Sequence, residues 1–352
     1  MVAVNVTKFD SMHPVDVGFA LFSFFSLFAQ SVVILVILKE RELRTSSFYM
    51  LSVALGITDL CTIVSHYVFQ RFAHTGVLPP SFYLDYSILA EMCTNGFSYF
   101  KSLQRYFLIA IGFNRFCAIV LPFAQKLRSS PLTLAIIVLA VFLTALPHII
   151  VSSLTSSYYY QSLVSQAAHR RRALISSEQN HGVRCRLNDR FIFNVHISYM
   201  VYQSVVAGIV LLALNIVIFT VLAANRCRLK DVLSSHRNRH FVEVKLAVIV
   251  VIHVLLLVGD TFAGMLTFIK KKRVTPTLSD SSCYRILQEM LRVVQIIQDV
   301  LCGCNPYLLV LFSTEVRRKV LLFLNFQSLK NVTVTLQSQP ETCVVEMRAM
   351  RE

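Results

Sequence analysis

Ionisable side chains stand inside long apolar stretches of this sequence, where an isolated charge is costly and normally faces other protein groups. Two cationic residues, Lys101 and Arg105, are one helical turn apart in such a stretch, so a helix would turn both in the same direction. Cationic groups held away from water suit an anionic or carboxylate-bearing small molecule. We therefore expect a ligand site within a helix bundle, formed by Lys101, Arg105, Arg292, Gln295, Asp299 and His66.

The same side chains allow a second interpretation, in which they neutralise one another inside the protein. A carboxylate at membrane depth normally turns toward the protein interior, and Asp59, Asp260 and Asp299 all have this setting. In this alternative, a carboxylate such as Asp299 pairs with Lys101 or Arg292. The sequence leaves both interpretations open, and both require the ionisable groups to face inward.

A further group of residues has the chemistry of a conformational switch. Arg115 follows Asn114 and has no carboxylate beside it in the chain, so it is available to another element, with Glu243 as the obvious candidate. The protein would be in a closed state when this ion pair is formed and in an open state when it is broken. In the alternative interpretation, Arg115 reaches out to lipid phosphate. Pro306, preceded by Asn305, removes a backbone hydrogen bond and permits a kink. We expect the switch to contain Asn114, Arg115, Glu243, Asn305, Pro306 and Asp59.

The sequence does not group its reactive side chains as a catalytic or metal site would. The Gly-x-Ser-x-Gly pattern of a nucleophilic serine does not occur. The histidines in the apolar stretches are dispersed over four of them: His66, His148, His196 and His253. We therefore expect no enzyme activity, no cofactor and no bound metal.

The elements that must position these residues are membrane-spanning helices. The chain is 55% hydrophobic and only 15% charged, whereas a soluble domain has about 25% charged residues. A spanning helix needs about 20 apolar residues, and longer runs favour helices over the strands of a barrel. Seven stretches qualify: Val17–Leu38, Ser47–Gln70, Tyr86–Ile119, Ser129–Ala168, Phe191–Asn225, Leu246–Ile269 and Ile286–Phe312. The sequence thus predicts an all-α bundle of seven transmembrane helices.

The flanking charges predict the orientation of this bundle. The first stretch is followed by Lys39, Arg41 and Arg44, and short flanks rich in Lys and Arg stay in the cytoplasm. The N-terminus should therefore lie outside and, after an odd number of spans, the C-terminus inside. Thr314–Asn325 predicts a short amphipathic helix at the inner membrane surface. On the outer side, Asn5 begins an Asn-Val-Thr sequon and is a candidate for glycosylation.

These features divide the chain into three parts. We expect residues 1–14 to form an extracellular N-terminus, residues 15–325 the seven-transmembrane domain with its short interfacial helix, and residues 326–352 a cytoplasmic tail. The net charge of +15 is better explained by anionic lipid and a cytoplasmic partner than by nucleic acid. The prediction is a multi-pass plasma-membrane protein with the lipid bilayer as a partner and no nucleic acid.

Two cysteines on the expected outer side are candidates for a disulfide. Cys93 lies at the outer end of the third stretch, and Cys185 in the long connection between the fourth and fifth. The outer face is oxidising, so a bridge between them would persist and would pin this connection over the bundle. Cys283 is also on the outer side and is a competing partner, and free thiols are the remaining alternative.

Three short motifs resemble those of seven-helix G-protein-coupled receptors. Asp59 lies in a Leu-x-x-x-Asp setting like that of the family's second helix. Asn114–Phe116 is similar to the Asp-Arg-Tyr motif, with Asn114 in place of the acid. Asn305-Pro306 is similar to the start of the Asn-Pro-x-x-Tyr motif, although Leu309 occupies the place of the tyrosine.

Longer stretches are similar to one branch of these receptors. Leu43–Met50, Ala54–Asp59 and Asn114–Phe123 resemble the nematode serpentine chemoreceptors, in class V of the gamma superfamily. The resemblance extends from about residue 15 to residue 325. It implies a seven-helix fold, a small-molecule ligand and a heterotrimeric G protein as a partner, and it does not name the ligand.

The leading hypothesis is therefore a G-protein-coupled chemosensory receptor. It would bind a small extracellular ligand within the helix bundle and signal to a cytoplasmic G protein, which requires that the ligand favour one of two helix packings. The alternative is a multi-pass transporter or a ligand-gated channel, which would also use intramembrane charges. The sequence contains neither an inverted repeat nor a pair of helices broken by Gly or Pro, both of which are typical of transporters.

Overall fold

A computed structural model gives the fold of the 352-residue chain. It describes residues 14–72, 82–83, 85, 87–121, 131–153, 157–161, 183–187, 190–228, 293 and 295–337, and, within a further segment, residues 248, 251–253, 255, 257–259 and 261–262. Helices make up most of this described part of the chain, and one two-stranded sheet accompanies them.

The helices follow the predicted apolar stretches. In chain order they are α1 (Pro14–Lys39), α2 (Arg41–Arg44), α3 (Ser47–Ser65), the π-helix η2 (His66–Arg71), α6 (Ser87–Glu91), the π-helix η3 (Met92–Gly96), α7 (Phe97–Val120), α9 (Pro131–Ser153), α11 (Arg190–Arg228), α14 (Asn305–Phe312) and α15 (Thr314–Gln337). The described residues between 248 and 262 are helical as well, so each of the seven predicted stretches contains helix. The prediction of an all-α bundle is confirmed.

Several of these helices have the length of a membrane span. Among the residues that the structure describes, four helices are long and apolar enough by themselves: Val17–Lys39, Ser47–Arg71, Phe97–Val120 and Ser198–Ala224. A fifth candidate is the pair Gln295–Gly303 and Asn305–Phe312, which is bent by 42° at the break between its halves. Pro306 stands in the first turn of the second half, where its missing N–H costs no helical hydrogen bond. The last span thus bends next to Pro306, where the sequence predicted that a kink is permitted, with the break just before the proline.

The fourth charge-free stretch contains a helix and the start of the long outer connection. α9 ends at Ser153, and strand β1 (Ser157–Gln161) lies after it, within that connection. β1 pairs antiparallel with β2 (Val183–Leu187), and Tyr159 lies opposite Cys185. The sequence of β1 is Ser-Tyr-Tyr-Tyr-Gln, and tyrosine favours strands. A count of charges alone does not distinguish such a segment from a spanning helix.

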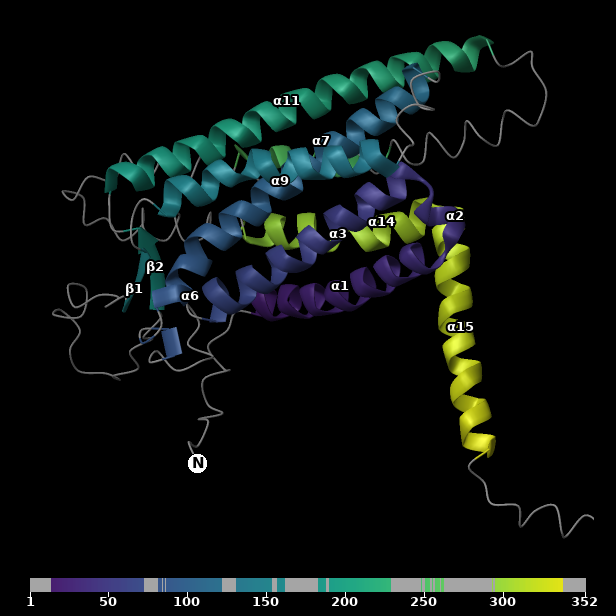
Figure 1. Cartoon of the computed structure of the whole chain (residues 1–352), viewed down its shortest axis with the longest axis horizontal. Coiled ribbons are helices and arrows are strands. Elements are labelled where there is room, and N and C mark those ends of the chain that lie inside the picture. The colour runs from purple at the N-terminus through teal and green to yellow at the C-terminus, as the bar shows by residue number, and fades with distance from the viewer. Residues whose placement is uncertain are drawn as a thin grey trace, which may run out of the picture.

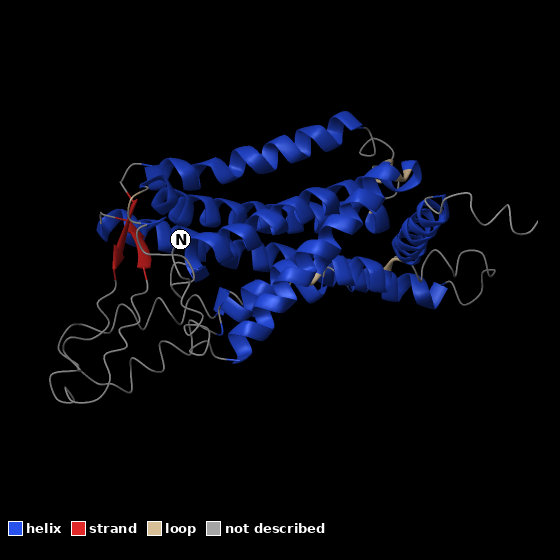
Figure 2. Cartoon of the chain, turned by 90° about the horizontal axis from the view of Figure 1, so that it is seen from below, coloured by secondary structure: helices blue, strands red, loops and turns tan. Residues whose placement is uncertain are grey.

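The helix after the last span begins where the sequence predicts it and ends later. α15 starts at Thr314 and continues to Gln337, beyond the expected end at Asn325. Its first turns pack against the bundle through Val316 and Val320, which are buried, whereas Leu321 is exposed. Figures 1 and 2 show α15 leaving the bundle at a steep angle, at the end opposite the β1–β2 hairpin. We call these two ends of the bundle the hairpin end and the α15 end.

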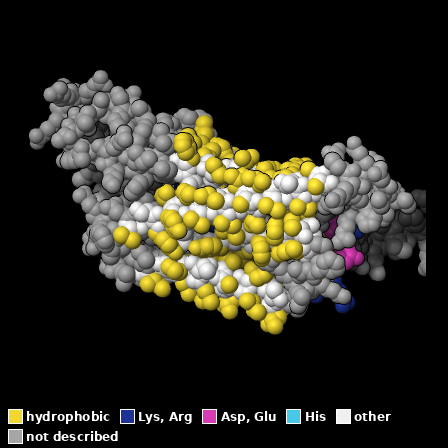
Figure 3. Space-filling view, turned by 90° about the horizontal axis from the view of Figure 1, so that it is seen from above, with side chains coloured by type: hydrophobic (Ala, Val, Ile, Leu, Met, Phe, Trp, Pro, Cys, Tyr) yellow, Lys and Arg dark blue, Asp and Glu magenta, His cyan; other side chains and the backbone are white. Residues whose placement is uncertain are grey.

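The core of the bundle lies around α7. This helix contacts α3, α9 and α11, and α1 packs against the far side of α3 (Figure 1). Leu103, Phe107 and Ile111 follow one another at four-residue steps along α7, and all three are buried. The exterior is also apolar: Phe24 and Phe28 of α1 are each 66% exposed, and hydrophobic side chains dominate the face shown in Figure 3. This surface suits lipid rather than water.

Candidate functional site

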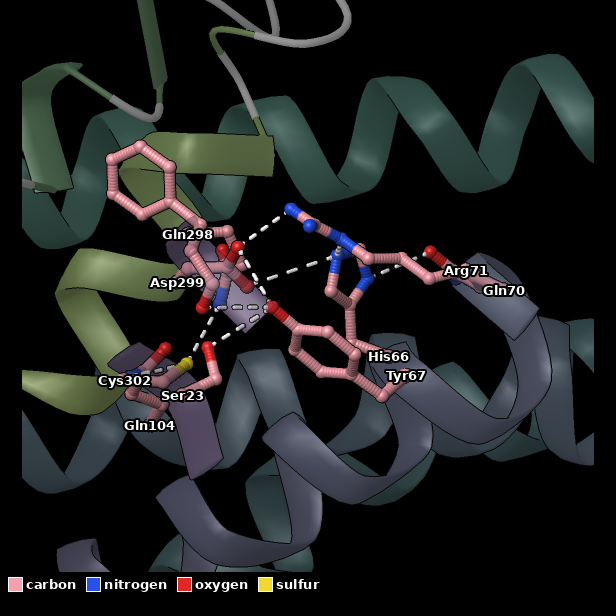
Figure 4. A network of polar contacts seen from close by, with 10 residues as sticks. Ser23, His66, Tyr67, Gln70, Arg71, Gln104, Gln298, Asp299 and Cys302 are labelled. Atoms are coloured by element: carbon pink, nitrogen blue, oxygen red, sulfur yellow. Dashed lines mark hydrogen bonds and ion pairs between the residues drawn. The ribbon is translucent and has the colours of Figure 1, made fainter. Parts of the chain in front are cut away.

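A buried ion pair joins the second and seventh spans in the half of the bundle toward the hairpin end. Arg71, the last residue of η2, donates from Nη2 to Asp299 Oδ2 at 2.5 Å (Figure 4). The two residues are 9% and 2% exposed. Because removing one partner of a buried ion pair leaves an uncompensated charge, this contact constrains the two helices strongly.

A second donor of Arg71 orients His66, the first residue of η2. Arg71 Nε donates to His66 Nε2 at 3.1 Å. Since an arginine nitrogen only donates, this ring nitrogen accepts, and the imidazole proton stands on Nδ1. That nitrogen lies 3.1 Å from Gln70 Oε1, to which it donates. His66 is therefore neutral, and its tautomer is fixed by the two neighbours shown in Figure 4.

Tyr67 connects the same ion pair to α1. Its hydroxyl lies 3.3 Å from Asp299 Oδ2, 3.1 Å from Ser23 Oγ and 3.1 Å from the carbonyl oxygen of Phe19. A phenol has a single proton to donate, so these acceptors share it between them. The aromatic ring also stacks under the guanidinium of Arg71, whose central carbon is 5.0 Å from the ring centroid. The network thus spans three helices.

A second polar cluster lies deeper in the bundle, around Asp59. Gln104 of α7 donates to Asp59 Oδ1 at 2.7 Å, and Asn305 of α14 donates to Oδ2 at 3.4 Å. The Gln104 amide nitrogen also lies 3.4 Å from the thiol sulfur of Cys302. Because Cys302 is one helical turn after Asp299 (Figure 4), the two clusters share the seventh span.

The two cationic residues of α7 lie beside this region and contact different neighbours. Lys101 Nζ lies 5.2 Å from the ring centroid of Phe97, and that ring stacks on His66 with centroids 5.3 Å apart. Arg105 Nη1 lies 3.9 Å from the sulfur of Met200 in α11. Both cationic side chains are buried. The structure therefore brings Lys101 and His66 into one cluster, as the predicted ligand site requires.

At the α15 end, Arg115 of the predicted switch contacts an aromatic ring. The guanidinium carbon of Arg115 lies 3.6 Å from the ring centroid of Phe48 in α3. Beside it, Asn114 Nδ2 donates to Ser47 Oγ at 2.8 Å. The next residue of α3, Tyr49, has its hydroxyl 2.9 Å from Ser313 Oγ, just before α15. Three consecutive residues of α3 thus fasten α7 on one side and the end of the seventh span on the other.

A surface ion pair fixes α15 to the short connection after α1. Lys319 Nζ lies 2.6 Å from Glu40 Oε2 and 3.8 Å from Glu42 Oε2. Lys39 lies over the ring of Phe323 at 5.5 Å from its centroid. These contacts explain why α15 starts against the bundle before it projects away.

Some predicted site residues fall outside the part of the chain that the structure describes. They are Arg292, Glu243, Asn5 and Cys283. For Cys185, the structure describes the backbone and not the side chain. Gln295 is half-buried at the start of the seventh-span helix. Asp299 has Arg71 as a cationic partner, so the predicted internal pairing of this carboxylate occurs, with an arginine that the sequence did not suggest.

Two residues of the cluster, Arg71 and Tyr67, were not predicted from the sequence, and the local backbone explains why. His66 and Gln70 lie on the α-helical stripe that begins at Asp59, whereas Arg71 does not. The backbone forms a π-helix from His66 to Arg71. Its wider turn brings the side chains of His66 and Arg71, which are five positions apart, into hydrogen-bond contact. Tyr67 has the same explanation. A charged residue at the end of an apolar stretch was the available signal for Arg71.

Cys93 lies within a small packed cap at the hairpin end. It is 1% exposed, and β2, which carries Cys185, contacts η3, which carries Cys93. Nearby, the Tyr83 hydroxyl donates to the carbonyl oxygen of Val68 at 2.7 Å. Burial raises the pKa of Tyr83 to about 12, so this phenol stays a donor at neutral pH.

An apolar exterior around an ion-paired, hydrogen-bonded interior defines an integral membrane helix bundle. Residues 19–326 match the family described as serpentine type 7TM GPCR chemoreceptor Srv. Because the match covers most of the chain, this protein belongs to that family, as the sequence motifs predicted. No curated protein matches the chain significantly.

Proposed function

We propose that this chain is a chemosensory receptor of the plasma membrane that binds a small extracellular ligand inside its helix bundle and signals to a heterotrimeric G protein. Membership of the serpentine chemoreceptor family over residues 19–326 is the observation that carries this proposal. The buried polar clusters add to it, because intramembrane charges mark functional sites. The receptor would act by binding and conformational change, without catalysis.

The proposed orientation places the N-terminus and the hairpin end outside. Basic residues support it, since Lys39 and Arg44 flank the end of α1 and Arg317 and Arg318 begin α15, all at one end of the bundle. In this orientation, Cys93 lies on the oxidising side, and we propose Cys185 as its disulfide partner. Asn5 would carry a glycan on the same side.

The proposed ligand site lies between α7, η2 and the seventh span. Lys101, Arg105 and His66 are buried and face this region from two helices. Gln295, Asp299 and Arg292 would complete it from the seventh span. Cationic side chains held away from water favour an anionic ligand. If Lys101 recognises the anion, Lys101→Ala will abolish any preference for acidic compounds, and an unchanged preference would remove Lys101 from the site.

The proposed switch lies between this site and the cytoplasm. Asp59 and Asn305 join the second and seventh spans, and Pro306 stands at the 42° bend. Arg115 and Asn114 contact α3 at the α15 end. A ligand that favours another packing of the seventh span would shift these contacts and expose the surface that binds the G protein. Glu243 is the proposed partner of Arg115 in one of the two states.

The direct test is a second-messenger assay in cells that express the full chain. Pools of small organic compounds should include at least one that raises the response above that of cells without the receptor. The Arg115→Ala variant, matched for surface expression, should lose the response while it still binds the compound. A ligand-gated current in a reconstituted bilayer that lacks G protein would instead favour a channel and contradict this proposal.

A further inference from the structure

We propose that Arg71 is the anchor for a carboxylate group of the ligand, and that Asp299 is a built-in competitor that occupies this anchor in the resting state. The inference rests on the proposed function, since it assigns a ligand class and a contact to the same site. It adds a residue at the end of η2 that the sequence motifs do not single out. The ligand class that it predicts is small organic monocarboxylates.

The present partner of Arg71 indicates the chemistry of the ligand. A guanidinium is planar and always charged, and it matches the geometry of a carboxylate. Here that carboxylate belongs to Asp299, which accepts from Nη2. A carboxylate of a ligand would offer Arg71 the same acceptor atoms. An amine or a neutral amide would not replace the negative charge that the buried guanidinium requires.

Release of Arg71 is feasible only if Asp299 keeps other donors, because an abandoned buried carboxylate is very costly. Two such donors lie in the part of the chain that the structure describes. The Tyr67 hydroxyl already lies 3.3 Å from Asp299 Oδ2. His66 Nε2 lies 3.9 Å from Asp299 Oδ1 and accepts from Arg71 Nε in the resting state. Once Arg71 turns to a ligand, this ring nitrogen becomes available to Asp299.

The exchange needs no change in the charge of His66, although the ligand itself brings one negative charge to Arg71. For His66 to donate to Asp299, its proton must leave Nδ1 and a proton must arrive at Nε2, so the imidazole stays neutral. The Nδ1 atom then becomes an acceptor, and the Gln70 amide, which now presents its oxygen at 3.1 Å, would turn to present its nitrogen. Tyr67, His66 and Gln70 thus form a set that can satisfy Asp299 with or without Arg71.

The location of the pair makes the exchange consequential. Arg71 is the last residue of η2, near the hairpin end, which is the outer end in the proposed orientation. Asp299 lies one turn before Cys302, whose sulfur contacts Gln104 of α7. Replacement of Asp299 by a ligand would therefore break the ion pair between the seventh span and η2, just above the cluster around Asp59, and leave only hydrogen bonds between neutral donors and Asp299 at this point. π-Helical turns are frequent at functional sites, in agreement with this role for η2.

The test is ligand binding by the purified full chain in lipid nanodiscs, measured as thermal stabilisation. The probes are straight-chain monocarboxylates from acetate to decanoate, each compared with its own primary amide. We expect at least one acid, and not its amide, to stabilise the wild type. Asp299→Asn should bind that acid about tenfold or more tightly, because a binding-competent state populated to about 10% or less becomes the resting state. Arg71→Gln should lose the acid-specific shift.

A variant that removes a single buried charge can fail to fold because its partner is left unpaired. A third variant therefore keeps the test decisive. Arg71→Gln combined with Asp299→Asn removes both charges and should fold, yet it should not distinguish acids from amides. Equal stabilisation by acids and amides, an unchanged affinity in Asp299→Asn, or acid-specific binding by the double variant would each overturn the inference. A second-messenger response to neutral compounds that survives Arg71→Gln would overturn it and leave the receptor function intact. Acid-specific binding without any G-protein response would support the inference and contradict the proposed receptor function.

Discussion

The two ends of this bundle hold an arginine in opposite ways. Toward the hairpin end, Arg71 is paired with the carboxylate of Asp299 and hydrogen-bonded to His66. Toward the α15 end, Arg115 lies against the face of Phe48, and its neighbour Asn114 bonds a hydroxyl. The first contact is strong, directional and replaceable only by another anion. The second includes contact with an aromatic face, which attracts a cation more weakly than a buried carboxylate does.

This difference suits a receptor whose two ends do different tasks. A ligand must supply specific chemistry to open the first contact, whereas the second need only respond to a movement of the helices. The cluster around Asp59 lies between them and contacts both α7 and the seventh span. It gives the two ends a physical connection made of named hydrogen bonds.

The largest effect should come from breaking the hairpin-end pair on one side only. Asp299→Asn leaves the Arg71 charge buried without its carboxylate, and the free energy of unfolding should fall by about 3–5 kcal/mol. Chemical unfolding of the purified chain measures this loss. Asp85→Asn, which changes an exposed carboxylate, is the matched control and should change stability by less than about 0.5 kcal/mol. A small loss in Asp299→Asn would mean that the pair does not hold the second and seventh spans together.

The second-largest effect should come from the cluster around Asp59, which connects the two ends of the bundle. Gln104→Leu removes the donor that lies 2.7 Å from Asp59 Oδ1 and should lower stability by about 1–3 kcal/mol. It should also weaken the coupling between ligand binding and the second-messenger response. Gln104→Glu is a useful comparison, because a second carboxylate beside Asp59 should be more harmful still. Normal coupling in Gln104→Leu would show that the two ends communicate by another route.

A smaller effect is expected at the α15 end. Phe48→Leu keeps an apolar side chain but removes the aromatic face under Arg115, a contact of about 0.5–2 kcal/mol. The released arginine should raise the basal second-messenger level several-fold, whereas Phe48→Tyr, which keeps the ring, should not. Equal basal levels in Phe48→Leu and Phe48→Tyr would argue that Arg115 is held by other contacts.

The smallest effect should belong to the ion pair of α15. Lys319 and Glu40 are partly exposed, with side chains 20% and 32% accessible, and surface pairs contribute about 0.2–1 kcal/mol. Lys319→Ala should therefore change stability slightly at low salt and not measurably at high salt. Arg318→Ala, at an exposed neighbouring position, is the control. A large loss at high salt would mean that Lys319 supports the fold through packing.

The sequence predicted the framework of this protein well. Seven apolar stretches became seven helical regions, and Pro306 marks the bend of the last one. Asp59 and Asp299 face the interior because a membrane leaves a carboxylate no other favourable place. These outcomes depend on composition and on the α-helical period, which a sequence displays directly.

The rest depended on local geometry that the sequence does not display. Arg71 reaches Asp299 from a π-helical turn, so an α-helical period could not align it with His66. β1 follows α9 in a charge-free stretch, where tyrosine and helix-forming apolar residues look alike to a count of charges. Arg115 contacts Phe48, an aromatic partner that a search for opposite charges would pass over. The prediction that Arg115 pairs with Glu243 stays a prediction.

The measurement that tests the account most directly is a double-mutant cycle on Arg71 and Asp299. Wild type, Arg71→Gln, Asp299→Asn and the double variant would be unfolded in the same nanodiscs. The account predicts that either single change destabilises the protein far more than both together, because the double variant leaves no buried charge alone. Additive losses would contradict it, since they would show that the two side chains do not interact in the folded receptor.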